Sequence, residues 1–196
     1  MKKTELEDER ESWNRRYKEG QQPFEPDQFL LNAYDDFIHP MFPKGGSALD
    51  IAGGLGRHAI WLAELRWRVT VVDISEVAFK KAQEKAEERG VKIEFLVRDL
   101  KTYQPERERY DLVVVFYYLQ RELSYDLVSA LKPGGLLIYK SYTHEHPEYG
   151  QRHPANPQYL LKTNELLHSF PSLRTLYYRE SIADGGTAEL VAIKAK

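Results

Sequence analysis

A glycine-rich turn between a short apolar run and a helical pattern constrains this chain more than any other feature. Residues 48–52 are mostly apolar and predict a buried strand, and residues 59–63 carry the spacing of a helix. The glycines at positions 53, 54 and 56 lie between them. Glycine accepts positive φ and lets the backbone approach a ligand closely. The first amides of the helix then favour an anionic group there, either a carboxylate or a phosphate.

An acidic residue ends the next apolar run, at residues 68–73. In a parallel sheet the end of that strand lies beside the glycine turn, so Asp73 is expected to face it. A carboxylate at this place can accept hydrogen bonds from both hydroxyls of a ribose. Turn and acid together predict a site for a ribose-containing cofactor. Residues 54–59 also fit the dinucleotide pattern G-x-G-x-x-A, which leaves a nicotinamide-dependent oxidoreductase open, as well as a strand-to-helix turn without a ligand.

Composition excludes several classes of function. The 196 residues carry a net charge of −2, which gives no general electrostatic case for binding nucleic acid or a membrane surface. There is no cysteine, so disulfides, thiolate metal sites and a cysteine nucleophile are excluded. The charged N-terminus is unlike a signal peptide, and no apolar run is long enough to span a membrane. We therefore expect a cytoplasmic protein with one domain over residues 1–196, its N-terminal helices over 1–40 and its core over 41–196.

Strand and helix patterns alternate along the rest of the chain and predict an α/β fold. Helices are expected over residues 5–19, 27–38, 76–89 and 122–131, and further strands over 91–97, 110–118, 136–142, 173–178 and 187–193. A proline and two glycines predict a turn at 132–135, and Asp-Gly-Gly predicts a hairpin turn at 183–186. The chain thus ends in an antiparallel hairpin, which a plain dinucleotide-binding domain lacks.

Two segments are candidates for bounding a ligand. Trp13 and Tyr17 are four residues apart, so they share a face of the first helix, which either packs on the domain or closes over a ligand together with Arg16. The long loop over 143–158 follows the strand at 136–142 and contains three histidines, His144, His146 and His153. Imidazoles suit a metal site, but solvated loop histidines are the more common case, and we assign no metal.

Taken together, these motifs resemble those of a class I S-adenosylmethionine-dependent methyltransferase. The matching pieces are Leu49–Gly56, Asp73, Asp99-Leu100, Tyr110–Val114 and Leu131–Gly135. Trp13–Tyr17 and the segment 164–173 are similar to the small bacterial enzymes of tellurite-resistance and thiopurine-methyltransferase type.

The resemblance implies a fold and a cofactor, S-adenosylmethionine, with S-adenosylhomocysteine as the product. The fold would be a three-layer, doubly wound Rossmann-like sheet of seven strands with the last antiparallel. The roles it implies are the methionine end for Ala52, Gly53, Gly54 and Gly56, the ribose for Asp73, the adenine for Ile74, Asp99 and Leu100, and the neighbourhood of the sulfonium for Phe116 and Tyr117. The family usually has glycine where this chain has Ala52, and alanine there needs negative φ or some strain.

The methyl acceptor is expected to be a small molecule, such as a thiol or a metalloid oxyanion, which needs no general base. No catalytic residue is assigned. The expected acceptor site is bounded by Trp13, Arg16, Tyr17, Tyr142 and His144, and Arg16 and Arg121 are candidates for holding an anionic acceptor. The strand at 110–118 lacks the Asn/Asp-Pro-Pro-aromatic sequence typical of methylation of base amino groups. A cofactor-binding protein without turnover stays an alternative, and a monomer and a homodimer are both open.

Overall fold

One seven-stranded sheet organises the chain, as a computed structural model describes it for residues 5–20, 23–145, 156–182 and 185–196. The strand order is β3-β2-β1-β4-β5-β7-β6. The strands are β1 (Ser47–Ile51), β2 (Arg68–Asp73), β3 (Ile93–Val97), β4 (Tyr110–Phe116), β5 (Leu131–Tyr142), β6 (Leu173–Ser181) and β7 (Thr187–Lys194). The five strands from β1 to β5 are all parallel to one another, and β7 is antiparallel to both β5 and β6. The predicted sheet of seven strands with the last antiparallel is confirmed.

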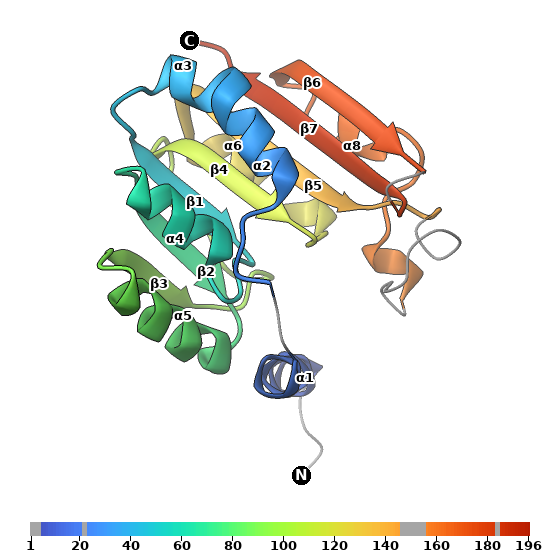
Figure 1. Cartoon of the computed structure of the whole chain (residues 1–196). Coiled ribbons are helices and arrows are strands. Elements are labelled where there is room, and N and C mark those ends of the chain that lie inside the picture. The colour runs from blue at the N-terminus through green and yellow to red at the C-terminus, as the bar shows by residue number, and fades with distance from the viewer. Residues whose placement is uncertain (1–4, 21–22, 146–155, 183–184) are drawn as a thin grey trace.

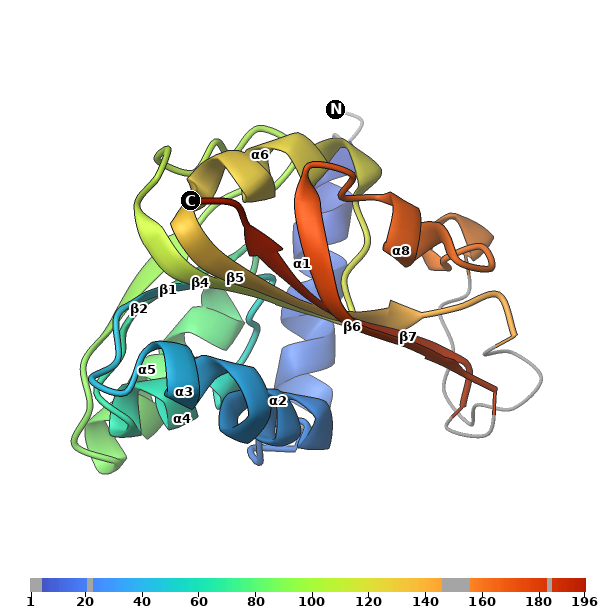
Figure 2. The same ribbon diagram turned by 90° about the horizontal axis from the view of Figure 1, so that it is seen from above.

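Helices cover both faces of the sheet and complete three layers (Figures 1 and 2). One face is covered by α2 (Gln28–Ala33), the π-helix η1 (Tyr34–Ile38), α3 (His39–Met41), α4 (Arg57–Glu64) and α5 (Glu76–Glu88). The other face carries η2 (Arg121–Leu123), α6 (Ser124–Ala130), η3 (Pro157–Tyr159) and α8 (Glu165–His168). The first helix, α1 (Glu5–Glu19), belongs to neither layer, because it crosses beyond the carboxyl ends of β1 and β2.

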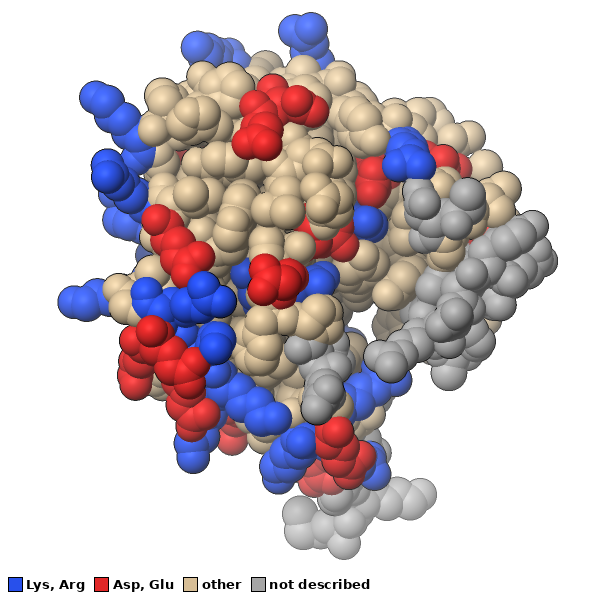
Figure 3. Space-filling view, viewed as in Figure 1, with Lys and Arg blue, Asp and Glu red and all other residues tan. Residues whose placement is uncertain are grey.

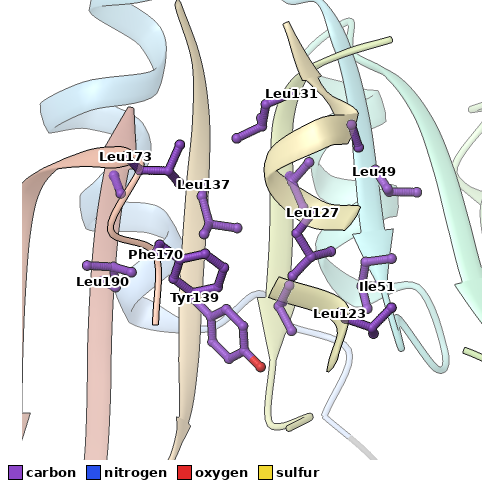
Figure 4. Close-up of a cluster of buried hydrophobic side chains, with 14 of the residues drawn as sticks. Leu49, Ile51, Leu123, Leu127, Leu131, Leu137, Tyr139, Phe170, Leu173 and Leu190 are labelled. Carbon is purple, nitrogen blue, oxygen red and sulfur yellow. The ribbon is translucent and has the colours of Figure 1, made fainter. Parts of the chain in front are cut away.

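The central strands are buried on both faces, which explains their nearly continuous apolar sequences. Figure 4 shows the cluster between the sheet and α6, where Leu49 and Ile51 of β1 meet Leu123 and Leu127. The alternate side chains, among them Ala48, point to the cluster on the opposite face, beneath α2 and α4. Because successive side chains point to opposite faces, these two clusters fix the register of the sheet.

Several predicted boundaries were wrong. The helix expected over 27–38 continues through η1 and α3 to Met41, and Pro40 follows the last π-type hydrogen bond of η1, which runs from the His39 amide to the Tyr34 carbonyl. The segment 132–135 is a bulge inside β5, which pairs Tyr110 with Leu131 before it shifts register. The strands β1 and β4 end at Ile51 and Phe116, one and two residues earlier than expected.

The predicted hairpin turn lies partly outside the described residues, which include Gly185 and Gly186 but not residues 183–184. The loop histidines His146 and His153 also lie outside them. No helix within the described part of the chain is both long and apolar enough to cross a membrane.

Candidate active site

The glycine turn follows β1 with three residues in the left-handed region. Ala52, Gly54 and Gly56 have φ of 53°, 53° and 71°. Glycine adopts this region freely, whereas alanine there is strained by about 1 kcal/mol. Of the two alternatives that the sequence left for Ala52, the structure therefore has the strained one. The turn then aims the first amides of α4 along the carboxyl edge of the sheet.

Asp73 lies beside the turn at the end of β2, as its position in the sequence predicts. Its carboxylate accepts hydrogen bonds from the amides of Gly54 and Ser75, both at 2.9 Å. Burial raises the pKa of Asp73, and the amide hydrogen bonds act in the opposite direction. The carboxylate is thus held in place by backbone donors from the turn and from the start of α5.

A second carboxylate, that of Asp50, lies beneath the turn in the core. Asp50 is 1% exposed, and neither of its oxygens makes a hydrogen bond of standard geometry with the described residues. Burial raises its pKa to about 7, while Arg57 and the amide of Ala59 act to lower it. A Cβ added to Gly53 would lie 2.8 Å from an Asp50 oxygen, so only glycine fits over this carboxylate. A buried acid without a partner is a site for a cationic group.

The helix α1 is fastened to the turn and to α5. The Oδ1 of Asn14 accepts hydrogen bonds from the Ser75 hydroxyl at 2.6 Å and, more weakly, from the Val77 amide at 3.4 Å. The Lys81 ammonium donates to the carbonyl of Tyr17 at 2.5 Å. Tyr17 is buried, and its hydroxyl lies so near Gly54 that an added Cβ there would be 2.5 Å from it.

Trp13 and Arg16 continue this stack on α1. The rings of Trp13 and Tyr17 lie 5.8 Å apart, and the Arg16 guanidinium is 5.0 Å from the Trp13 ring centre. The sequence left two roles open for this helix, packing on the domain or closing over a ligand. The two aromatics pack against Leu55 and Ala78, and in this position they cover the glycine turn.

The predicted adenine residues follow β2 and β3. Ile74 is half-buried directly after Asp73. Asp99 is half-buried and accepts a hydrogen bond from the amide of Lys101, while Leu100 is buried against the α6 face of the sheet. These residues lie at the same carboxyl edge as the turn, and Lys101 forms an ion pair of 2.9 Å with Glu9 of α1.

Tyr117 follows β4 in the left-handed region, with φ of 58°. Its amide donates to the carbonyl of Lys140 at 2.8 Å, and its hydroxyl donates to Asp27 at 2.5 Å. The Arg57 guanidinium, next to the glycine turn, lies 5.8 Å from the centre of its ring. The ring centre of Tyr142, at the end of β5, lies 4.8 Å from that of Tyr117. The structure therefore brings Tyr117 and Tyr142 together beside the turn.

Phe116, the other residue predicted near the sulfonium, is buried. Its ring centre lies 4.1 Å from that of His58 in α4. His58 is 3% exposed, and its Nε2 has no hydrogen-bond partner in the described part of the chain. Burial lowers the pKa of His58 to about 3, so the ring is neutral at physiological pH.

Two predicted acceptor residues lie in different surroundings. Arg121 is committed to the protein itself, because it forms hydrogen bonds with Glu165 and with the carbonyls of Gln158 and Leu160. His144 is exposed, next to Glu145, after the end of β5. Among the described residues no group of three or more histidine or acidic side chains has the arrangement of a metal site.

Sequence reasoning missed four charged residues at this edge. Asp27 caps the start of α2, and its carboxylate also forms an ion pair of 3.0 Å with Lys140 of β5. Lys140 forms a second pair of 3.1 Å with Glu189 of β7. Arg57 opens α4. The only sequence signal among them is Asp27 just before an apolar helical stripe, which marks a cap and not a site.

Comparison with known proteins agrees with this geometry. The family model described as "Methyltransferase domain" matches residues 48–135, which include the glycine turn, Asp73 and β4. No curated protein gives a significant match to the sequence.

Solved structures similar to this chain share its fold. The N-methyltransferase NodS from Bradyrhizobium japonicum WM9, in complex with S-adenosylhomocysteine, is 19% identical with a TM-score of 0.69, over 95% of this chain and 98% of that one. TehB from Haemophilus influenzae is 18% identical with a TM-score of 0.65, over 94% of this chain and 66% of that one. A protein of echinomycin biosynthesis, described for converting a disulfide bond into a thioacetal group, is 21% identical with a TM-score of 0.71, over 95% and 92%.

Proposed function

We propose that the chain is a class I S-adenosylmethionine-dependent methyltransferase and that it methylates a small molecule at the carboxyl edge of its sheet. The observation that most supports this is the meeting of the glycine turn, Asp73 and Tyr117 at the ends of β1, β2 and β4. This edge is where the direction of winding reverses between β1 and β4, and it is the usual place for a ligand in a doubly wound sheet.

The buried groups at the turn fit the cofactor. Asp50, a carboxylate without a hydrogen-bond partner in the described residues, suits the ammonium of the methionine end, and Arg57 suits its carboxylate. Residues 52–56 would hold this end of the cofactor. Asp73 would bind the ribose, and Ile74, Asp99 and Leu100 would enclose the adenine. The cofactor supplies a methyl group on a sulfonium, which is already a good leaving group. The protein has to align the acceptor and exclude water.

The helix α1 would act as a lid over this site, as part of an N-terminal cap over residues 1–40. Tyr17 covers Gly54 in the structure, so its ring has to move for a ligand to reach the turn. Trp13, Arg16 and Tyr17 would then bound the acceptor from one side, with Tyr142 and His144 on the other. Arg121 would shape this side through its hydrogen bonds with the segment 158–165 and not by holding an anion itself.

A small acceptor agrees better with the surface than nucleic acid does. The net charge is −2, and in Figure 3 basic and acidic side chains alternate over the region of α1 and α5. The thiol or metalloid oxyanion expected from the sequence needs no general base, and these acceptors are to be screened together with other small nucleophiles. We propose that the protein works in the cytoplasm, as a monomer or a homodimer.

Calorimetric titration with S-adenosylmethionine, S-adenosylhomocysteine and NAD tests the cofactor site. We expect micromolar binding of the first two and at least tenfold weaker binding in Asp73→Asn. Asp111→Asn is the matched control, because Asp111 also accepts a hydrogen bond from a backbone amide but lies at the amino end of β4. Binding of NAD alone would overturn the proposal, and cofactor binding without transfer to any acceptor would favour a protein that binds the cofactor without turnover.

A further inference from the structure

The hydroxyl of Tyr117 has its proton committed to a buried carboxylate. It donates to Asp27 Oδ2 at 2.5 Å, while Asp27 Oδ1 accepts from the Lys140 ammonium at 3.0 Å and from the Phe29 amide at 2.9 Å. The Asp27 side chain is only 9% exposed. A tyrosine hydroxyl has one proton, so the oxygen of Tyr117 can only accept a further hydrogen bond.

The charged groups around this oxygen include both signs. Lys140 lies between two carboxylates, those of Asp27 and Glu189, at 3.0 Å and 3.1 Å. The Arg57 guanidinium, 5.8 Å from the centre of the Tyr117 ring, adds a second cation, so the group has no net negative charge. The preference of the Tyr117 oxygen for a hydrogen-bond donor therefore follows from its committed proton and not from net charge.

The backbone holds Tyr117 at the end of β4 in a strained conformation. A tyrosine in the left-handed region costs about 1–2 kcal/mol, and residues held in this way cluster at functional sites. Three contacts maintain it: the bond of its amide to Lys140 and the ring contact with Tyr142, both in β5, and the bond of its hydroxyl to Asp27 at the N-cap of α2. The direction of the hydroxyl is therefore set by the N-cap of α2 and by β5.

We propose that the Tyr117 oxygen accepts a hydrogen bond from the N–H of an amine acceptor, and that Asp27, Lys140 and Glu189 position it for this purpose. The inference rests on the proposed function and names the class of its acceptor. Tyr117 touches the acceptor, whereas the three charged residues act through Tyr117.

The chemistry balances without a further reactant. The nitrogen lone pair forms the new C–N bond while the C–S bond breaks, and its electron pair stays on sulfur. Positive charge thereby leaves the sulfonium and develops on the nitrogen, which then loses a proton to water. The Tyr117 oxygen, polarised by the Asp27 carboxylate that accepts its proton, stabilises this nitrogen as its charge grows. A fully ionised oxyanion acceptor has no proton to donate to this oxygen.

The test compares three probe acceptors with radiolabelled S-adenosylmethionine: benzylamine, benzyl mercaptan and selenite. We expect transfer to the amine to be fastest. Tyr117→Phe keeps the ring and Asp27→Asn keeps the shape of the cap, and in each kcat for the amine should fall at least tenfold with unchanged cofactor affinity. A lower kcat with an unchanged Kd for the cofactor is a result that a merely structural role of Asp27 would not produce.

Asp111→Asn again serves as the matched control and should keep kcat within twofold. Faster transfer to selenite or to the mercaptan would overturn the amine assignment, as would an unchanged kcat in Tyr117→Phe. No transfer to benzylamine by a protein that binds S-adenosylhomocysteine counts against the inference as well. Failure to bind S-adenosylhomocysteine would instead overturn the proposed function, so the two failures are distinguishable. Thermal melting of each variant identifies any that does not fold.

Discussion

The hydroxyl of Tyr17 lies directly over the backbone of Gly54, where a Cβ would be only 2.5 Å from its oxygen. The contact joins the N-terminal helix to the turn after β1. It also ties the position of α1 to the absence of a side chain at residue 54. The glycine is therefore required twice, once for its φ of 53° and once for the space that Tyr17 fills.

Gly54→Ala should consequently undock α1. The added methyl group meets Tyr17 and also strains the backbone, while Gly90→Ala adds the same strain at φ of 68° with nothing within 4 Å. We expect Gly90→Ala to lower the free energy of unfolding by about 1 kcal/mol and Gly54→Ala to lower it by more. Hydrogen exchange over residues 5–19 should accelerate in Gly54→Ala alone. Equal exchange in the two variants would show that Tyr17 does not hold the helix.

Asp50 should destabilise the cofactor-free protein as the pH rises. Its pKa is about 7 in the folded chain and near 3.8 when unfolded, so the folded state binds more protons between these values. Stability then falls as the pH rises from 4 to 7, by at most about 1.4 kcal/mol per pH unit, and stays low above 7. Asp50→Asn should remove this loss and raise the melting temperature at pH 8 but not at pH 4.

Cofactor binding provides the counter-test for Asp50. If its carboxylate receives the methionine ammonium, Asp50→Asn should weaken S-adenosylhomocysteine binding at least tenfold at pH 8. If Asp50→Asn is more stable and binds S-adenosylhomocysteine as well as the parent chain does, Asp50 is a core residue that does not contact the cofactor.

His58 should give the opposite pH dependence. Its pKa is about 3 in the folded chain because of its burial, and near 6.5 in the unfolded chain, which therefore binds the proton first. The contribution of His58 to the free energy of unfolding is complete above pH 6.5 and decreases as the pH falls, by about 1.4 kcal/mol per pH unit. The free energy of unfolding, measured with urea at several pH values between 4 and 7, should change less steeply with pH in His58→Gln than in the parent chain. The exposed His168→Gln is the control and should keep the parent slope.

The pattern of residues along the chain predicts the fold well, because it depends on local periodicity and on parallel winding. The turn after β1 and Asp73 lie 19 residues apart and meet because adjacent parallel strands end at the same edge. Tyr117 follows β4 to that edge by the same rule. Local signals fail where one motif has two structural uses, as at 132–135, where a proline and two glycines form a bulge instead of a turn.

The charged network behind Tyr117 is not predictable in this way. Asp27 and Tyr117 are 90 residues apart, and Asp27 and Lys140 are 113 apart, so their contact depends on how α2 packs on the sheet. Arg121 is a second example. Its residue type suggests a cation that is free to bind an acceptor, but the fold places Glu165 against it. Residue types show which chemistry is available, and only tertiary packing decides which charges are already paired.

Ala52→Gly tests whether the strain after β1 has a function. Ala52 has φ of 53°, and glycine at this position should raise the free energy of unfolding by about 0.5–1 kcal/mol. Arg66→Gly is the matched control, because Arg66 has φ of 70° in an exposed turn at the amino end of β2. Equal stabilisation of both, with tighter S-adenosylhomocysteine binding in Ala52→Gly alone, would mean that the alanine methyl group limits the cofactor site. Unchanged binding would mean that the turn already has the conformation the cofactor needs, and that Ala52 holds it at the expense of stability.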